Sequence, residues 1–487
     1  MKPMSMIPLY RGILLFALVF PLFSANVYAQ DEETKTLTIT TDSDDARRHF
    51  MQGMHDQDNV FFERARVHFA AAVAADPGFA LAQLMHDTTV PGLNQAQRIA
   101  KLNESLNGIT QASTAELLFA TGIREQVAGN GANALALFAA AADLVPDDPH
   151  VATRHAGQVG AGGSPERIAA TRNLTERFPD NAAAYNTLAY GLWGTGDKAG
   201  AREAVSKYVE LEPNHPNSHD SYAELFQFSG MYGQAIKHYK KAIALDENYF
   251  AGYAGLSEAL LLSGDADGAR AALATGRQHA PNANAKANLT RAEANTYFQQ
   301  GDGKMGLSTL KKAAKEIEAA NPGGAPQVHR ELAVAEALYG NKNNVAAHIS
   351  KATELQTGSG TGTYAWATIA HSIVGNVDDA RTAARGFEKA SNGNSFTKTL
   401  DGIVLVAAGD YAAAEKTLLA AGLNNPWSKA FMARCQKEMG NTAEALSLER
   451  EIMSDNQFTA NNFGYTLSRL TLVEGGAGHV RAGLELN

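Results

Sequence analysis

The chain has 487 residues, 45% of them hydrophobic, and a formal net charge of −9. Its single cysteine, Cys435, excludes an intrachain disulfide, so the stability of the fold must come from packing. The acidic balance and the lack of a Lys/Arg stripe with interleaved aromatic residues exclude a typical nucleic-acid-binding protein, since binding to phosphate depends on cationic contacts.

Residues 1–29 have the features of an export signal. Lys2 and Arg11 precede a short apolar run, residues 12–23, and the segment 27–29 (Val-Tyr-Ala) offers small residues at the two positions that a signal peptidase reads. The apolar run is short for a bilayer-spanning helix, although an uncleaved membrane anchor is the alternative. We therefore expect an exported protein, periplasmic in the first place and secreted as the second possibility.

The polar, acidic segment 30–44 is expected to be a short linker, and residues 45–455 an array of repeats that is clearest at 182–281. In that clearest part, three sets of residues recur at a spacing of 34: Gly196, Gly230 and Gly264; Ala189, Ala223 and Ser257; Ala201, Ala235 and Ala269. A period of 34 is typical of a helix-turn-helix repeat.

Each repeated position has a mechanical reason. Tyr185, Leu188, Ala189 and Leu192 follow the spacing i, i+3, i+4, i+7 and form one apolar stripe on a first helix. The small residues let two helix backbones approach closely, and the turn glycine accepts the left-handed conformation that ends a helix. A single helix pair cannot bury its apolar face, so the pairs must stack.

This pattern resembles the tetratricopeptide repeat (TPR), W-x2-L-G-x2-Y followed by A-x3-F and P. In the copy that begins at residue 182, the matching residues after the first-helix stripe are Ala201, Val205, Tyr208 and Pro213. The resemblance implies an all-α, right-handed superhelical solenoid of stacked helix-turn-helix hairpins. It also implies a binding scaffold without catalytic residues or cofactors.

We expect about ten to eleven units, with a C-terminal capping helix and tail at 456–487. Residues 79–114 suggest a diverged repeat with a long turn. Cys435 falls on a predicted first helix, where a small buried residue is the ordinary interpretation. The turn glycine recurs after the clearest copies at less regular steps: Gly301, Gly340, Gly375, Gly409 and Gly440.

Motifs of catalysis are missing from the sequence. There is no G-x-S-x-G elbow, no HExxH and no phosphate loop. His215 and His219, beside Asp220, form an i, i+4 pair that could hold a metal on a helix, but Pro216 places His215 in the turn. We expect no metal site, and we keep a small-ligand or metal-binding periplasmic protein only as the alternative to a scaffold.

The resemblance places ligands on a concave groove lined by the first helices. The residues that it carries over to this groove are Asn186, Tyr190, Trp193, Asp220, Glu224, Gln227, Phe228 and Glu258. Trp193 and Phe228 are either partly exposed aromatic residues or pack on the neighbouring helix. The Lys/Asn/Arg carboxylate clamp of some TPR co-chaperones is not found here, and the groove is acidic and aromatic. A basic or apolar peptide, or a partner helix, is the expected ligand.

Overall fold

The computed structural model describes residues 35–356 and 360–454. The export signal predicted at 1–29 and the capping helix predicted at 456–487 both lie outside these described residues. Within them, no helix is long and apolar enough to span a membrane.

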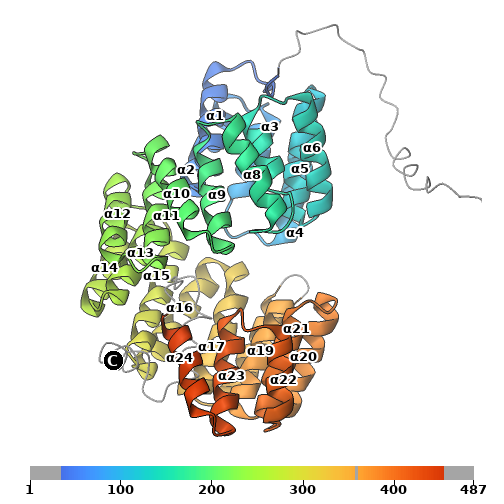
Figure 1. Cartoon of the computed structure of the whole chain (residues 1–487). Coiled ribbons are helices and arrows are strands. Elements are labelled where there is room, and N and C mark those ends of the chain that lie inside the picture. The colour runs from blue at the N-terminus through green and yellow to red at the C-terminus, as the bar shows by residue number, and fades with distance from the viewer. Residues whose placement is uncertain (1–34, 357–359, 455–487) are drawn as a thin grey trace, which may run out of the picture.

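The described residues form 24 α-helices and one short 3-10 helix in a continuous array (Figure 1). The helices are α1 (Asp44–Asp58), α2 (Phe62–Ala75), α3 (Ala80–Thr89), α4 (Gln95–Gly108), α5 (Thr114–Ala128), α6 (Gly131–Leu144), α7 (Pro149–Ala156), α8 (Pro165–Arg177), α9 (Ala182–Gly194), α10 (Lys198–Leu211), α11 (Pro216–Phe228), α12 (Tyr232–Leu245), α13 (Phe250–Leu262), α14 (Ala266–His279), α15 (Ala283–Gln299), α16 (Gly303–Ala320), η1 (Pro322–Gly324), α17 (Ala325–Tyr339), α18 (Asn344–Leu355), α19 (Thr361–Val374), α20 (Val377–Ser391), α21 (Phe396–Ala407), α22 (Tyr411–Ala421), α23 (Pro426–Glu438) and α24 (Thr442–Ser454).

Consecutive helices pack as antiparallel pairs, and the pairs stack into an all-α solenoid, as the sequence predicted. The described helices make twelve such pairs, more than the ten to eleven units expected. The irregular stretch 79–114 is a complete pair, α3 and α4, whose short first helix hides the period from the sequence. First helices also contact one another along the array, for example α17 with α19 and α19 with α21.

The repeated small residues are buried where two helices of a pair meet. Ala189, Ala223 and Ser257 are at most 2% exposed. Where the facing residue of the second helix is Phe, the small residue is Gly: a Cβ on Gly53 would lie 2.6 Å from the Phe69 ring. Such a contact is too short for two carbon atoms. A large ring on the second helix therefore requires a residue without a side chain on the first helix, and the core stays close-packed. Cys435 is fully buried on α23, as expected.

The turns between paired helices use left-handed residues, and most of the predicted turn glycines have positive φ. Gly340 is the exception, with φ −117°, because the Glu336 carboxylate holds this turn by accepting from the Asn341 amide at 2.7 Å. In the turn between α1 and α2, the left-handed position is occupied by Val60, at φ 64°. A β-branched residue in this region is strained.

Residues 35–43, part of the segment expected to be a short linker, pack against the first repeats. The Leu37 amide donates to Asp148 at 3.0 Å, and the Thr40 hydroxyl donates to Glu116 at 2.6 Å. Ile39 is buried against the first helices. The alternating residues of this segment therefore pack across the α5 and α7 ends, and the array has an ordered strap before α1.

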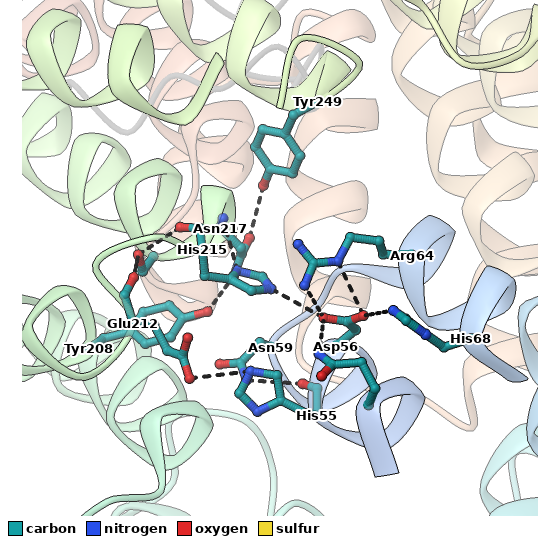
Figure 2. Close-up of polar contacts among 12 residues, drawn as sticks. His55, Asp56, Asn59, Arg64, His68, Tyr208, Glu212, His215, Asn217 and Tyr249 are labelled. Carbon is teal, nitrogen blue, oxygen red and sulfur yellow. Dashed lines mark hydrogen bonds and ion pairs between the residues drawn. The ribbon is translucent and has the colours of Figure 1, made fainter. Parts of the chain in front are cut away.

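The first helix pair also contacts repeats much further along the chain. Asp56, at the end of α1, is 0% exposed and lies 2.9 Å from an Arg64 nitrogen and 3.9 Å from His215, which precedes α11 (Figure 2). Phe61 packs edge-to-face on Tyr249, with ring centroids 5.6 Å apart. We call this contact between the α1–α2 pair and the α10–α13 region the junction. It closes the N-terminal half of the solenoid on itself.

Candidate functional site

A hollow of about 230 Å³ lies on the side of the solenoid formed by the first helices α11, α13 and α15. Its acidic lining comes from Asp220 and Glu224 on α11 and Glu258 on α13. Tyr239 and Phe250 add aromatic surface, and among the described residues that line it there is no Lys, Arg or His. The lining of the hollow is therefore acidic and aromatic.

Residues at the same position of successive repeats meet at the edge of this hollow. Tyr190 and Glu224 are 34 residues apart, and the Tyr190 hydroxyl donates a hydrogen bond to the Glu224 carboxylate. Glu258 is another 34 residues on, and it accepts from Gln227 Nε2 at 3.2 Å. Stacking of equivalent repeats thus converts one repeat position into a row of neighbouring polar side chains.

The carboxyl groups of the hollow are held in a protein environment that disfavours their charge. Burial, and then repulsion by Glu224, raise the pKa of Asp220 to about 8, against an opposing hydrogen bond with Tyr249. Burial likewise raises the pKa of Glu224, and the hydrogen bond from Tyr190 only partly offsets it. Both side chains are partly exposed but lie deep in the hollow. A bound cation would restore their ionised forms.

The structure divides the eight predicted groove residues into two groups. Asp220, Glu224 and Glu258 line the hollow, and Tyr190, 36% exposed, lies at its edge. Asn186, Trp193 and Gln227 are buried, so the expectation that they are accessible groove residues was wrong, whereas Phe228 is partly buried.

Trp193 is 7% exposed and packs against Phe228 with ring centroids 5.5 Å apart. Contact with the neighbouring helix, the alternative left open by the sequence, is thus the observed arrangement.

Sequence reasoning missed several residues that line the hollow, among them Tyr239, Phe250 and Asn288. Asn288 on α15 lies 68 residues after Asp220, at the same repeat position two copies later, so extending the period beyond residue 281 would have found it. Phe250 is the first residue of α13, where the apolar pattern gives no sign that its ring faces a hollow.

The alternative of a metal site on His215 and His219 is not supported by their geometry. His215 precedes α11 and faces Asp56 of the junction, whereas the two nitrogens of His219 lie 3.0 Å from His238 Nδ1 and 2.9 Å from the Pro213 carbonyl. Proline at the start of α11 separates the two imidazoles, so the i, i+4 spacing does not bring them together. Across the described ranges, no group of three or more His, Cys, Asp or Glu could hold a metal ion.

Similar histidine pairs recur in other repeats. His49 with His68 and His329 with His348 have Nδ1 atoms 3.3 Å and 3.1 Å apart, and each pair has the same sequence separation of 19 as His219 and His238. In each case, one histidine lies on the first helix and the other on the second helix of the same helix pair. In each pair, one ring nitrogen can donate to the other, which acts as an acceptor.

Comparison with solved structures returns helical-repeat proteins. A crystal structure of MamA protein is 15% identical and covers 34% of this chain and 91% of its own, with a TM-score of 0.29. TTC0263, a thermophilic TPR protein in Thermus thermophilus, is 20% identical and covers 37% of this chain and 98% of its own, with a TM-score of 0.32. Among curated proteins, none matches.

The family model described as tetratricopeptide repeat matches residues 229–292. This segment runs from the end of α11 through α14 into α15, across the most regular pairs of the array and the hollow that they form. The same architecture continues over the described chain. It is marked by paired helices at this period, small residues at the helix contacts and glycine turns. Residues 229–292 are therefore similar to the tetratricopeptide repeat, and the other described helices continue the same paired-helix architecture.

Proposed function

We propose that this protein is an exported, non-enzymatic scaffold that binds a basic segment of a partner protein in the hollow of α11, α13 and α15. Tetratricopeptide-repeat proteins are generally protein-interaction scaffolds, and this fold is typically non-catalytic. The carrying observation is the pair Asp220 and Glu224, two carboxyl groups in one hollow without a cationic residue in its lining. A Lys or Arg side chain of a partner supplies the missing positive charge.

The neighbouring aromatic residues support a cationic ligand over a purely apolar one. Tyr239 and Phe250 line the same hollow as the carboxyl groups, and ring faces attract a cation through their quadrupole. The hollow of about 230 Å³ fits one side chain rather than a whole helix. A bound peptide therefore anchors one basic residue here and lays its remaining length along the first helices.

A peptide-binding measurement tests this proposal. Fluorescently labelled peptides of one length, with Lys, Arg, Glu or Ser at the central position, are titrated with the purified chain. We expect the Lys and Arg peptides to bind, with an affinity that falls at high salt. The double variant Asp220→Asn, Glu224→Gln should weaken this binding by about tenfold or more, since a desolvated charge pair is lost.

The matched control changes acids outside the hollow. A double variant of the exposed Asp267 and Asp378 to Asn removes the same charge while leaving the lining intact. Equal binding of the Lys and Glu peptides, or equal loss in both double variants, would contradict a specific basic-residue site.

Export is proposed on the N-terminal sequence alone: Lys2 and Arg11 before the apolar run and the small residues at 27–29. Fractionation of cells that express the full chain, followed by N-terminal sequencing, tests it. The expected product is found in the periplasm and begins at Gln30. A product that keeps Met1 and remains with the membrane would favour the anchor instead.

A further inference from the structure

A second cavity, of about 410 Å³, lies beside the junction and away from the acidic hollow. Four segments that are distant in the sequence enclose it: the end of α1, the start of α7, the turn between α8 and α9, and the end of α10. Its volume is within the range of roughly 300–1,000 Å³ that is typical of small-molecule sites. The cavity exists because the first helix pair closes on later repeats.

One wall of this cavity holds an amide oxygen without a partner. Asn59, the residue after α1, is 3% exposed, and its Nδ2 donates to the His55 carbonyl at 3.0 Å. Its Oδ1 is buried and has no hydrogen-bond partner among the described residues. Figure 2 shows the Asn59 side chain beside His55, on the side of Glu212, and all three residues line the cavity. An unsatisfied buried acceptor of this kind requires a donor.

The charged groups around Asn59 are, by contrast, already paired. Asp58 accepts from His150 Nδ1 at 2.5 Å and from Arg154 at 3.1 Å, and His55 Nε2 lies 3.3 Å from Glu212. The hydrogen bond with Glu212 raises the pKa of His55. These pairs fix the wall and leave the Asn59 oxygen as the group that lacks a donor.

The part of the lining at the start of α9 offers hydrogen-bond donors. Ala182 and Ala183, the first two residues of α9, line the cavity, and the first N–H groups of a helix have no partner within it and carry its positive end. Arg177 and Asp180 also line the cavity, and an Arg177 nitrogen donates to the Pro146 carbonyl at 2.6 Å. Phe178 and Pro149 provide apolar surface between the two polar walls.

We propose that this cavity binds a small zwitterion of the α-amino-acid type, with its ammonium group donating to Asn59 Oδ1 and its carboxylate at the start of α9 beside Arg177. The two polar walls match the two ends of such a molecule. The charges of Asp58 and Glu212 are paired within the chain, and the remaining charges of the lining, Arg177 and Asp180, are of opposite sign. The ligand bridges the α1 end to the α9 start, so its binding holds the junction closed.

This proposal is tested by thermal shift and calorimetric titration of the full chain. The ligands are the twenty L-amino acids, each tested singly at millimolar concentration. At least one amino acid should raise the melting temperature and bind at one site per chain. The N-acetyl and the amide derivatives of that amino acid should each bind about tenfold more weakly or worse, since each removes one of the two charges.

Two variants test the site itself. Asn59→Leu removes the acceptor at nearly constant volume and should abolish the shift without lowering the melting temperature of the free protein. Ala183→Leu fills the cavity at the α9 start and should abolish binding even if the Asn59 variant folds poorly. The double variant of the acidic hollow should bind the amino acid like wild type, so failure of this proposal is separate from failure of the basic-peptide proposal.

Three results would overturn the proposal: no amino acid bound by the wild type, equal binding by Asn59→Leu, or equal binding of both blocked derivatives.

Discussion

The junction and the acidic hollow both withdraw carboxyl groups from water, but they give them different partners. On the α1 side of the junction, Asp56 is paired with Arg64 of α2, and the neighbouring Asp58 is paired with Arg154 and His150 of α7. In the hollow, the carboxyl groups interact with tyrosine hydroxyl groups instead: Asp220 with Tyr249, and Glu224 with Tyr190. Arg154, together with the hydrogen bond from His150, outweighs burial and lowers the pKa of Asp58, whereas burial raises that of Asp220.

This difference separates a structural role from a binding role. Carboxylates that are paired within the chain hold two segments together, and removing one partner leaves a buried charge alone. Carboxyl groups that have no cationic partner within the chain can instead pair with a cationic group of a ligand. The same residue type in the same solenoid thus closes the array in one place and prepares it for a ligand in another.

Removing Asp56 is the most severe way to break the junction. We expect Asp56→Ala to lower the free energy of unfolding by about 2–3 kcal/mol, because Arg64 and His215 lose a buried carboxylate partner. Urea denaturation followed by circular dichroism measures this. Asp45→Ala is the control: its ion pair with Arg48 is mostly exposed, and we expect a loss below about 1 kcal/mol. Similar losses in both variants would show that the junction adds no stability.

Acid should act on the junction through His215. Burial lowers the pKa of this imidazole to about 4, below its usual value near 6.5. Between those two values the unfolded chain binds the proton and the folded one does not, so stability falls as the pH is lowered from about 6.5 to 4. His215→Asn should reduce this loss by an amount of the order of 3 kcal/mol. Unfolding of both proteins at pH 7 and pH 4 measures the difference, and parallel losses would contradict it.

The hollow should show the opposite dependence on pH. The pKa of Asp220 is raised to about 8, so the folded state keeps a proton that the unfolded state releases, and stability falls as the pH rises from about 4 to 8. Asp220→Asn should recover about 1–2 kcal/mol at pH 8, a value reduced for the partial exposure of the side chain. Asp267→Asn, at an exposed position, is the control. A destabilised Asp220 variant would show that its charge is compensated.

The smallest expected effect concerns the backbone beside the junction. Val60→Gly should stabilise the protein by about 1 kcal/mol, because Gly accepts positive φ and the strain of a β-branched residue disappears. The reverse change at the equivalent turn, Gly230→Val, should destabilise. Thermal unfolding compares the two variants with wild type. A less stable Val60→Gly protein would mean that the Val60 side chain contributes more contact than its conformation costs.

The sequence predicted the contacts that form within one repeat or between adjacent repeats. Tyr190 and Glu224 could be placed together because residues 34 apart in adjacent copies meet in space. The junction could not be foreseen, because it joins residues many repeats apart, such as His55 with Glu212 and Phe61 with Tyr249. Such contacts depend on the cumulative curvature of many repeats, which no local pattern reports. His215 and His219 failed as a pair because the turn before Pro216 turns one imidazole away.

Closure of the first helix pair on the α10–α13 region also restricts how this protein can change its length during evolution. Repeat arrays readily gain or lose a copy, because each unit contacts only its neighbours. Loss of one pair between α3 and α8 would shift Glu212 and His215 by a whole unit relative to His55 and Asp56 and separate both contacts. The number of units before α10 is therefore fixed by the junction. Between α17 and α24, where successive first helices contact one another, a copy can be gained or lost with repair of a single interface.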